Sequence, residues 1–152
     1  MHTACRHPKP IQLRGSLMGP NEIDVIRVYT TESKENVADE TPLLVGGTSF
    51  DVVVEAECGG SRADGAPFEV AIMAFDYSAG TNPSSFGTFS QSDSGTLDKP
   101  TWLKYRKRFT VDITNIGAVD GHVMQYTAIL RAAKGPNRVA KFATSPLFIV
   151  QQ

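Results

Sequence analysis

The stretch TSFDVVVEAEC, residues Thr48–Cys58, indicates the fold class of this chain. Every second residue is apolar, and this row consists of Phe50, Val52, Val54, Ala56 and Cys58. The positions between them hold Asp51, Val53, Glu55 and Glu57. An apolar period of two is typical of a strand with one face in a core and the other toward water. The stretch therefore predicts a half-buried β-strand.

The same period recurs along most of the chain. We expect further strands within residues 22–30, 66–77, 103–114, 121–133 and 137–152. Glycine, proline, asparagine and aspartate separate these segments, as turn chemistry requires. No segment has a capped helical stripe. The sequence thus predicts an all-β, antiparallel, two-sheet sandwich of about seven to eight strands.

For two of the predicted strands, the sequence also indicates which faces are buried. In residues 22–30, alternation places Ile23, Val25 and Tyr29 on one face, interrupted by Arg27. Residues 66–77, APFEVAIMAFDY, are apolar at both odd and even positions. We interpret this second segment as a central strand that is covered on both sides.

The domain organisation follows from length and from turn residues. A chain of 152 residues is of the size of one domain. Residues 1–20 have several prolines and glycines without an apolar period, so we expect an N-terminal tail or arm there. Residues 21–152 are then a single β-sandwich domain.

The last two predicted strands resemble those of immunoglobulin-like and fibronectin type III-like sandwiches. The stretch VDGHVMQYTA has an Asp- and Gly-containing turn, Asp120 and Gly121, before Tyr126, and FATSPLFIV has a proline before an apolar finish. The resemblance implies an immunoglobulin-like sandwich in which the Tyr126 hydroxyl ties down the corner. The chain departs from the antibody type by having Ala128 where that type has a cysteine. The resemblance implies a scaffold and no activity.

Charge and targeting features restrict the partners. The formal net charge of -1 gives no global attraction to nucleic acid, so we expect no nucleic-acid partner. No window approaches 18 apolar residues, and the start has no secretory h-region, so we expect no membrane contact and a cytoplasmic location by default. A mature secreted form is the alternative. Pairing of Cys5 with Cys58 stays open.

We predict no metal and no cofactor. His2, Cys5 and His7 are candidate soft ligands, but termini of this kind are usually disordered. The segment SDSGTLD, residues 92–98, lacks the complete spacing of a calcium loop.

The longest stretch without alternation, residues 78–102, is a candidate recognition surface. It places Phe86, Phe89 and Trp102 in a background of Ser, Thr, Gly and Asn. Loops of this length are uncommon in compact domains and are often functional. The alternative interpretation makes FGTFSQ, residues 86–91, a short edge strand between turns.

The only dense basic run, KYRKR, adds three candidate binding residues. Alternation places Lys104, Arg106 and Arg108 in one outward row beside Trp102. This row could bind a phosphate, a sulfated glycan or an acidic partner. In the alternative, it is a solvated row whose charge discourages aggregation and which pairs with acids on neighbouring strands.

The function we predict is a non-enzymatic binding or assembly module without catalytic residues. Its partner is a protein or a second copy, bound through residues 78–102 or an exposed sheet edge. The sequence has no G-x-S-x-G, H-E-x-x-H or phosphate-binding glycine motif. One alternative is a carbohydrate-binding domain that stacks sugars on Trp102 and Tyr105. The other is a small hydrolase or lyase with His122 and nearby acids as general acid and base.

Overall fold

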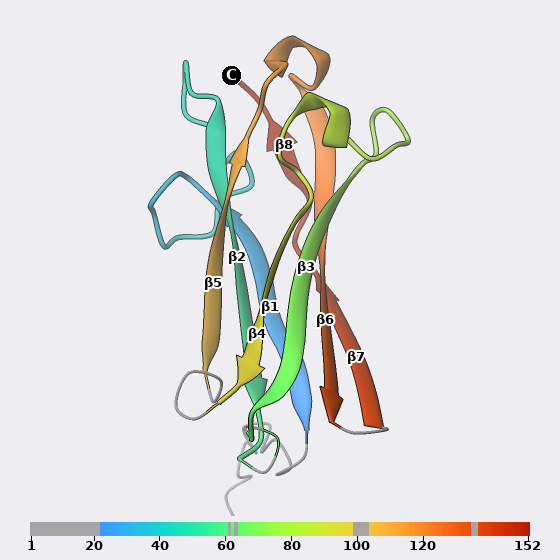
Figure 1. The fold of residues 1–152 in the computed structure, drawn as a ribbon. Coiled ribbons are helices and arrows are strands. Elements are labelled where there is room, and N and C mark those ends of the chain that lie inside the picture. The colour runs from blue at the N-terminus through green and yellow to red at the C-terminus, as the bar shows by residue number, and fades with distance from the viewer. Residues whose placement is uncertain (1–21, 61, 63, 99–103, 135–136) are drawn as a thin grey trace, which may run out of the picture.

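A computed structural model of the chain describes residues 22–60, 62, 64–98, 104–134 and 137–152. The described part is all-β, with strands in two antiparallel sheets (Figure 1). The strands are β1 (Ile23–Thr31), β2 (Ser49–Cys58), β3 (Ala66–Asp76), β4 (Gln91–Leu97), β5 (Tyr105–Asp112), β6 (His122–Lys134), β7 (Asn137–Thr144) and β8 (Phe148–Val150). Two short 3-10 helices, η1 (Ser84–Phe86) and η2 (Ile116–Ala118), lie in connections.

The sheets confirm the predicted two-sheet sandwich. One has three strands in the order β1-β2-β5, and the other has the order β4-β3-β6-β7, with β8 paired to the start of β6. All pairings are antiparallel. The predicted strand in Thr48–Cys58 is β2, the central strand of the smaller sheet.

Aromatic side chains from both sheets meet at the centre of the core. Phe50 of β2 lies 5.5 Å from Phe148 and 6.4 Å from Tyr126, measured between ring centroids. The rings of Tyr126 and Phe148 stack at 5.6 Å, and Phe89 approaches Phe50 at 6.4 Å. These four side chains are almost fully buried. Burial of such large apolar surfaces supplies most of the driving force for folding.

A β-bulge in β1 corrects the expected face of Tyr29. The pairing with β2 shifts between Val25 and Arg27, so alternation changes phase at Ile26. Val28 then points into the core, whereas Tyr29 joins Arg27 on the outer side of the sheet, where the Arg27 guanidinium lies 4.1 Å from the ring centroid. An inserted residue moves every later side chain to the opposite face.

The interpretation of residues 66–77 as covered on both sides is wrong for the outer side. β3 lies between β4 and β6, as a central strand should. Its inward residues, such as Val70 and Ile72, are buried. Its outward residues Met73 and Phe75 are 41% and 43% exposed.

Residues 78–98 form a connection followed by an edge strand. The strand, β4, begins at Gln91 and therefore lies after most of FGTFSQ. Before it, the Phe86 carbonyl accepts the Thr114 N–H, and Gly87 forms a β-bridge with Ile113. This part of the predicted loop is thus attached to the end of β5.

Several expectations fall on residues outside the described ranges. The predicted tail, residues 1–20, is among them, and so are Cys5 and Trp102. Among the described residues, no helix has the length and apolarity needed to span a bilayer.

Candidate functional site

The predicted aromatic binding residues occupy different environments. Phe89 is fully buried in the aromatic core, where its ring lies next to that of Phe50. Phe86 is half-buried and packs against the same core. Trp102 lies outside the described residues. A binding role for these three residues stays a prediction.

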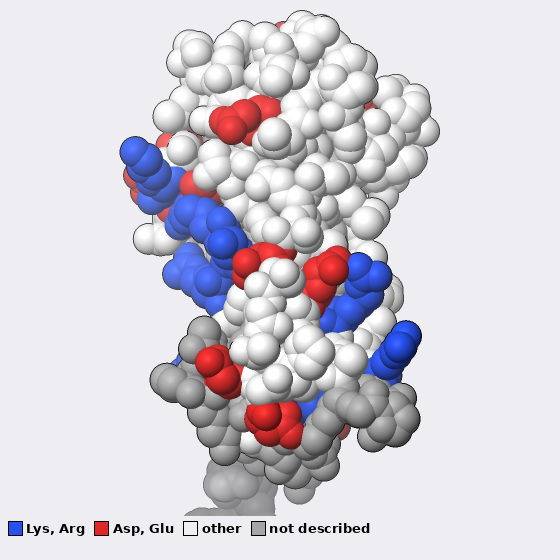
Figure 2. All heavy atoms as spheres, in the orientation of Figure 1, with Lys and Arg blue, Asp and Glu red and all other residues white. Residues whose placement is uncertain are grey.

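The predicted basic row lies on the outer side of the smaller sheet, and charged side chains gather along β5 in the view of Figure 2. Arg106 and Arg108 are engaged: Arg108 Nη1 donates to Asp51 Oδ2 at 2.9 Å, and both guanidinium groups donate to Asn36 Oδ1. Lys104 is exposed. Arginines held in such a network serve the fold directly, and their role in binding also stays a prediction.

Asp51 is the buried centre of that network. Its carboxylate accepts from the Lys34 amide at 2.7 Å and from Thr110 Oγ1 at 2.8 Å, in addition to Arg108. Burial alone would raise the pKa of Asp51, but these hydrogen bonds and the Arg108 charge outweigh it and lower the pKa. The network attaches the segment after β1 to the outer side of β2.

His122, the candidate general acid or base, is paired with a buried carboxylate. His122 Nδ1 lies 2.7 Å from Asp76 Oδ2, and Asp76 Oδ1 accepts from the amides of Ser78 and Ala79. Asp76 therefore shapes the turn after β3 as well as orienting the histidine ring. The sequence offered no way to identify this partner, because it lies 46 residues away.

Tyr126 does not make the bond that the resemblance implied. Its side chain is fully buried, and its hydroxyl has no hydrogen-bond partner among the described residues. Burial raises the pKa of Tyr126 well above its ordinary value. The backbone of Tyr126 instead binds the connection between β7 and β8: the Ser145 hydroxyl accepts the Tyr126 N–H, and the Ser145 N–H donates to the Tyr126 carbonyl.

The largest group of exposed apolar side chains lies on the outer side of the five-stranded sheet. We call it the outer apolar face and define it by Ala71, Met73, Phe75, Tyr77, Val123, Ile129 and Phe142. Met73, Phe75, Tyr77 and Phe142 are the large exposed members, and Phe142 is 71% exposed.

The strand register explains why these residues share one face. Ala71, Ile129 and Phe142 are direct cross-strand neighbours on β3, β6 and β7. Toward the end of β3, the rings of Phe75 and Tyr77 meet edge to face at 5.0 Å. Residues two apart on a strand point the same way, so the aromatic side chains line up with the central row.

Among the described strand residues of this outer side, the charged ones lie at one end. The row next to Ala71, Ile129 and Phe142 contains Glu69 and Arg131, which form an ion pair.

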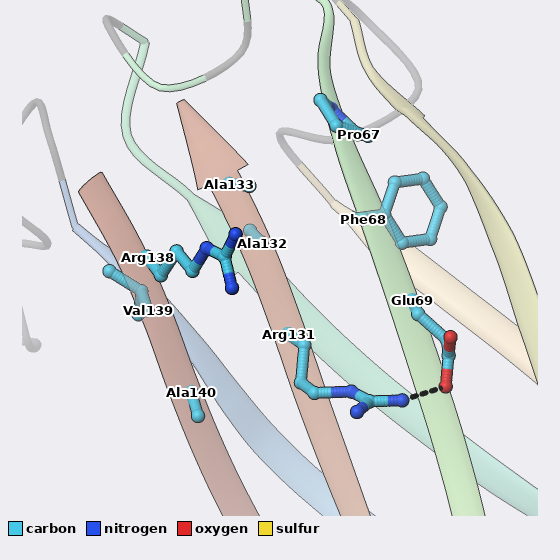
Figure 3. Close-up of a pocket in the computed structure, with 9 residues that line it drawn as sticks. All are labelled: Pro67, Phe68, Glu69, Arg131, Ala132, Ala133, Arg138, Val139 and Ala140. Carbon is cyan, nitrogen blue, oxygen red and sulfur yellow. Dashed lines mark hydrogen bonds and ion pairs between the residues drawn. The ribbon is translucent and has the colours of Figure 1, made fainter. Parts of the chain in front are cut away.

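A groove lies at the same charged end. Its lining comes from three neighbouring strands: Pro67, Phe68 and Glu69 of β3, Arg131, Ala132 and Ala133 of β6, and Arg138, Val139 and Ala140 of β7. Figure 3 shows the Arg138 side chain extending from β7 toward β6, and the Arg131 side chain extending from β6 toward Glu69. The groove has a volume of about 560 Å³ and is mostly apolar.

Comparisons with known proteins give partial structural similarities at low sequence identity. No protein-family model matches the sequence, and no curated protein matches it. A solved structure of a "putative beta-galactosidase from bacteroides fragilis" has a TM-score of 0.46 and 14% identity, over 84% of this chain and 17% of that one. A glycosyl hydrolase family 2 member from Bacteroides cellulosilyticus DSM 14838 has a TM-score of 0.44 and 10% identity, over 88% and 16%. The chain thus spans about a sixth of the length of these proteins.

Proposed function

We propose that this chain is a non-enzymatic binding module that contacts a partner protein through the outer apolar face. The observation that carries the proposal is the group of exposed Met73, Phe75, Tyr77 and Phe142 side chains on one sheet surface. Contiguous exposed apolar patches mark interaction sites, because leaving them in water is costly.

The composition and layout of this surface support a protein partner. Aromatic residues and methionine are enriched in the cores of protein interfaces, where charged residues are depleted. The cross-strand rows through Ala71 and Met73 contain no charged side chain, and the Glu69–Arg131 pair lies at the edge. A charge-poor centre with a polar rim is the usual anatomy of an interface.

The geometry of the rings favours a protein over a flat sugar surface. The planes of Phe75 and Tyr77 are inclined by 76° to each other. A sugar ring stacks on one flat aromatic face, whereas a partner side chain can pack into the angle between two rings. Tyr105, the other predicted stacking residue, is buried, and its hydroxyl donates to Asp93 at 2.7 Å.

The test compares Phe142→Arg with Val45→Arg. Both wild-type side chains are highly exposed, but Val45 lies in the connection between β1 and β2 and is not part of the outer apolar face. The partner is first isolated from an extract of the source cells on the immobilised wild-type protein, and is then purified. We expect it to bind the wild type and Val45→Arg with equal affinity. Its affinity for Phe142→Arg should be lower by about tenfold or more, as for loss of a central interface contact. If the partner is a second copy of the chain, sedimentation velocity should show a dimer for the wild type and Val45→Arg and a monomer for Phe142→Arg.

Two outcomes would contradict this assignment. Loss of the partner in Lys104→Ala, with Phe142→Arg unaffected, would move the contact to the predicted basic row. Binding of a soluble oligosaccharide that is lost in Phe142→Arg, without any protein partner, would make the face a carbohydrate site.

A further inference from the structure

We propose that the groove beside the outer apolar face binds a carboxylate side chain from an extended segment of the partner protein. Arg138 and Arg131 are its cationic contacts. The inference rests on the proposed function and adds the chemistry of the partner: an Asp or Glu close in sequence to an apolar residue.

The groove exists because small and long side chains alternate at this end of the sheet. Ala133 is the cross-strand neighbour of Arg138, and Ala140 is the neighbour of Arg131. The two methyl groups leave a hollow, and Pro67 and the arginine side chains rise around it (Figure 3). Because the hollow is open to solvent along the sheet, it suits a side chain presented by a peptide.

The charges that line the groove favour an anion. Two arginines and one glutamate give a net charge of +1. Arg138 has no hydrogen-bond or ion-pair partner among the described residues. Arg131 is paired with Glu69, but the two side chains are 63% and 38% exposed, so water already competes for that pair.

The two arginines can act on the same carboxylate. They are diagonal neighbours on β6 and β7, because Arg131 lies opposite Ala140 and Arg138 opposite Ala133. Such diagonal positions are about 7–8 Å apart, within reach of long side chains. Guanidinium groups bind carboxylates in a bidentate manner, which fixes orientation as well as charge.

The distance to Phe142 sets the spacing in the partner. Arg138 and Phe142 lie on the same face of β7, four residues apart, and Ala140 lies between them. A strand advances by about 3.3 Å per residue. An extended segment that places its acid between the two arginines therefore places a residue about two to four positions away over Phe142.

The test starts from a random peptide library displayed on phage and selected on the wild-type protein. We expect the selected peptides to contain Asp or Glu two to four residues from an aromatic or large aliphatic residue. Synthetic versions are then measured by fluorescence anisotropy. Arg138→Glu should weaken binding roughly tenfold or more, since a hydrogen-bonded charge pair is lost and a repulsion is added. Lys141→Glu, at an exposed lysine on the opposite face of the same strand, should leave it unchanged.

A charge exchange makes the assignment specific. A peptide whose acid is replaced by lysine should bind Arg138→Glu better than it binds the wild type. Equal melting temperatures of the wild type and the variants show that the fold is intact. Peptides without acids, or binding that is unaffected by Arg138→Glu, would overturn the inference. If the selected peptides do not depend on Arg138 but their binding is lost in Phe142→Ser, the inference about the groove fails and the proposed function stands. If no selected peptide depends on Phe142, the inference and the proposed function both fail.

Discussion

At the scale of single residues, Asp51 shows how a charge becomes part of the fold. Its carboxylate is only 1% exposed, yet it accepts hydrogen bonds from two separate segments: the turn at Lys34, and β5 through Arg108 and Thr110. Lys34 adopts a left-handed φ of 70°, which is unusual for a residue with a side chain. The bond from its amide to Asp51 helps to hold this conformation.

Asp51→Asn tests this network through pH. We expect the free energy of unfolding to fall by about 1.5–3 kcal/mol at neutral pH, because charge-assisted hydrogen bonds are lost. The folded pKa of Asp51 is lowered, so its contribution is present above the unfolded pKa of about 3.9 and is lost as the pH falls through the lower folded value. Urea unfolding of wild type and variant at a series of pH values should therefore converge in acid. Asp112→Asn, at an exposed site on β5, is the control. If the free energy of unfolding of Asp51→Asn stayed below that of the wild type by the same amount at every pH, the proposed role of the Asp51 charge would be contradicted.

At the scale of elements, the connection before β4 is fixed by a close backbone approach. A Cβ atom at Gly87 would lie 2.4 Å from the Asp112 carbonyl oxygen and 3.0 Å from the Ile113 Cα. These are backbone atoms, so they cannot rotate away. The connection can therefore cross the end of β5 only with a glycine at this point.

Gly87→Ala should therefore destabilise the protein. We expect a loss of about 1–3 kcal/mol in the free energy of unfolding, the usual cost of overpacking. Gly117→Ala is the matched control, because its Cβ would meet only the Asn115 side-chain oxygen, at 3.8 Å. Thermal melts should separate the two variants. Similar melting temperatures would show that the backbone around Gly87 can shift without loss of stability, which would contradict this prediction.

The elements also show what the sequence could predict. β5 follows from alternation, because its apolar residues point into the core and the residues between them are exposed or half-buried. β2 follows from alternation too, but the expectation of an outer side toward water holds only for Glu55 and Glu57, because Asp51 and Val53 on that side are buried. β4 does not follow from alternation, since QSDSGTL has polar and glycine residues at an edge, where pairing to β3 is enough to form a strand. The outer apolar face was hidden because Met73 and Phe75 look the same in sequence whether or not another layer covers them. The groove depends on the β6–β7 register, which places Arg138 beside Arg131 and which no local pattern gives.

At the scale of the whole molecule, one residue near the C-terminal end connects the two sheets. Phe148 of β8 packs on Phe50 of one sheet and stacks on Tyr126 of the other. Its neighbour Leu147 is 53% exposed. The last strand is only three residues long, yet it fills the centre of the core.

Phe148→Ala should accordingly cost about 3–5 kcal/mol, as for other buried aromatic truncations. That is a large share of the roughly 5–15 kcal/mol that holds a typical domain together. Leu147→Ala should change the free energy of unfolding by little. Equilibrium denaturation in guanidinium chloride measures both, and equal midpoints would show that β8 is not needed for the core.

The position of β8 also governs how the chain behaves during synthesis. The Ile149 amide donates to the Glu40 carbonyl, so a segment that is made early is fastened by one that is made late. At about 5–20 residues per second, the ribosome needs roughly 5–20 s to translate the distance between these two residues. For that time the inner surface of β2 is without the ring of Phe148. During this interval the apolar surface that Phe148 later covers is open to contact with another newly made chain.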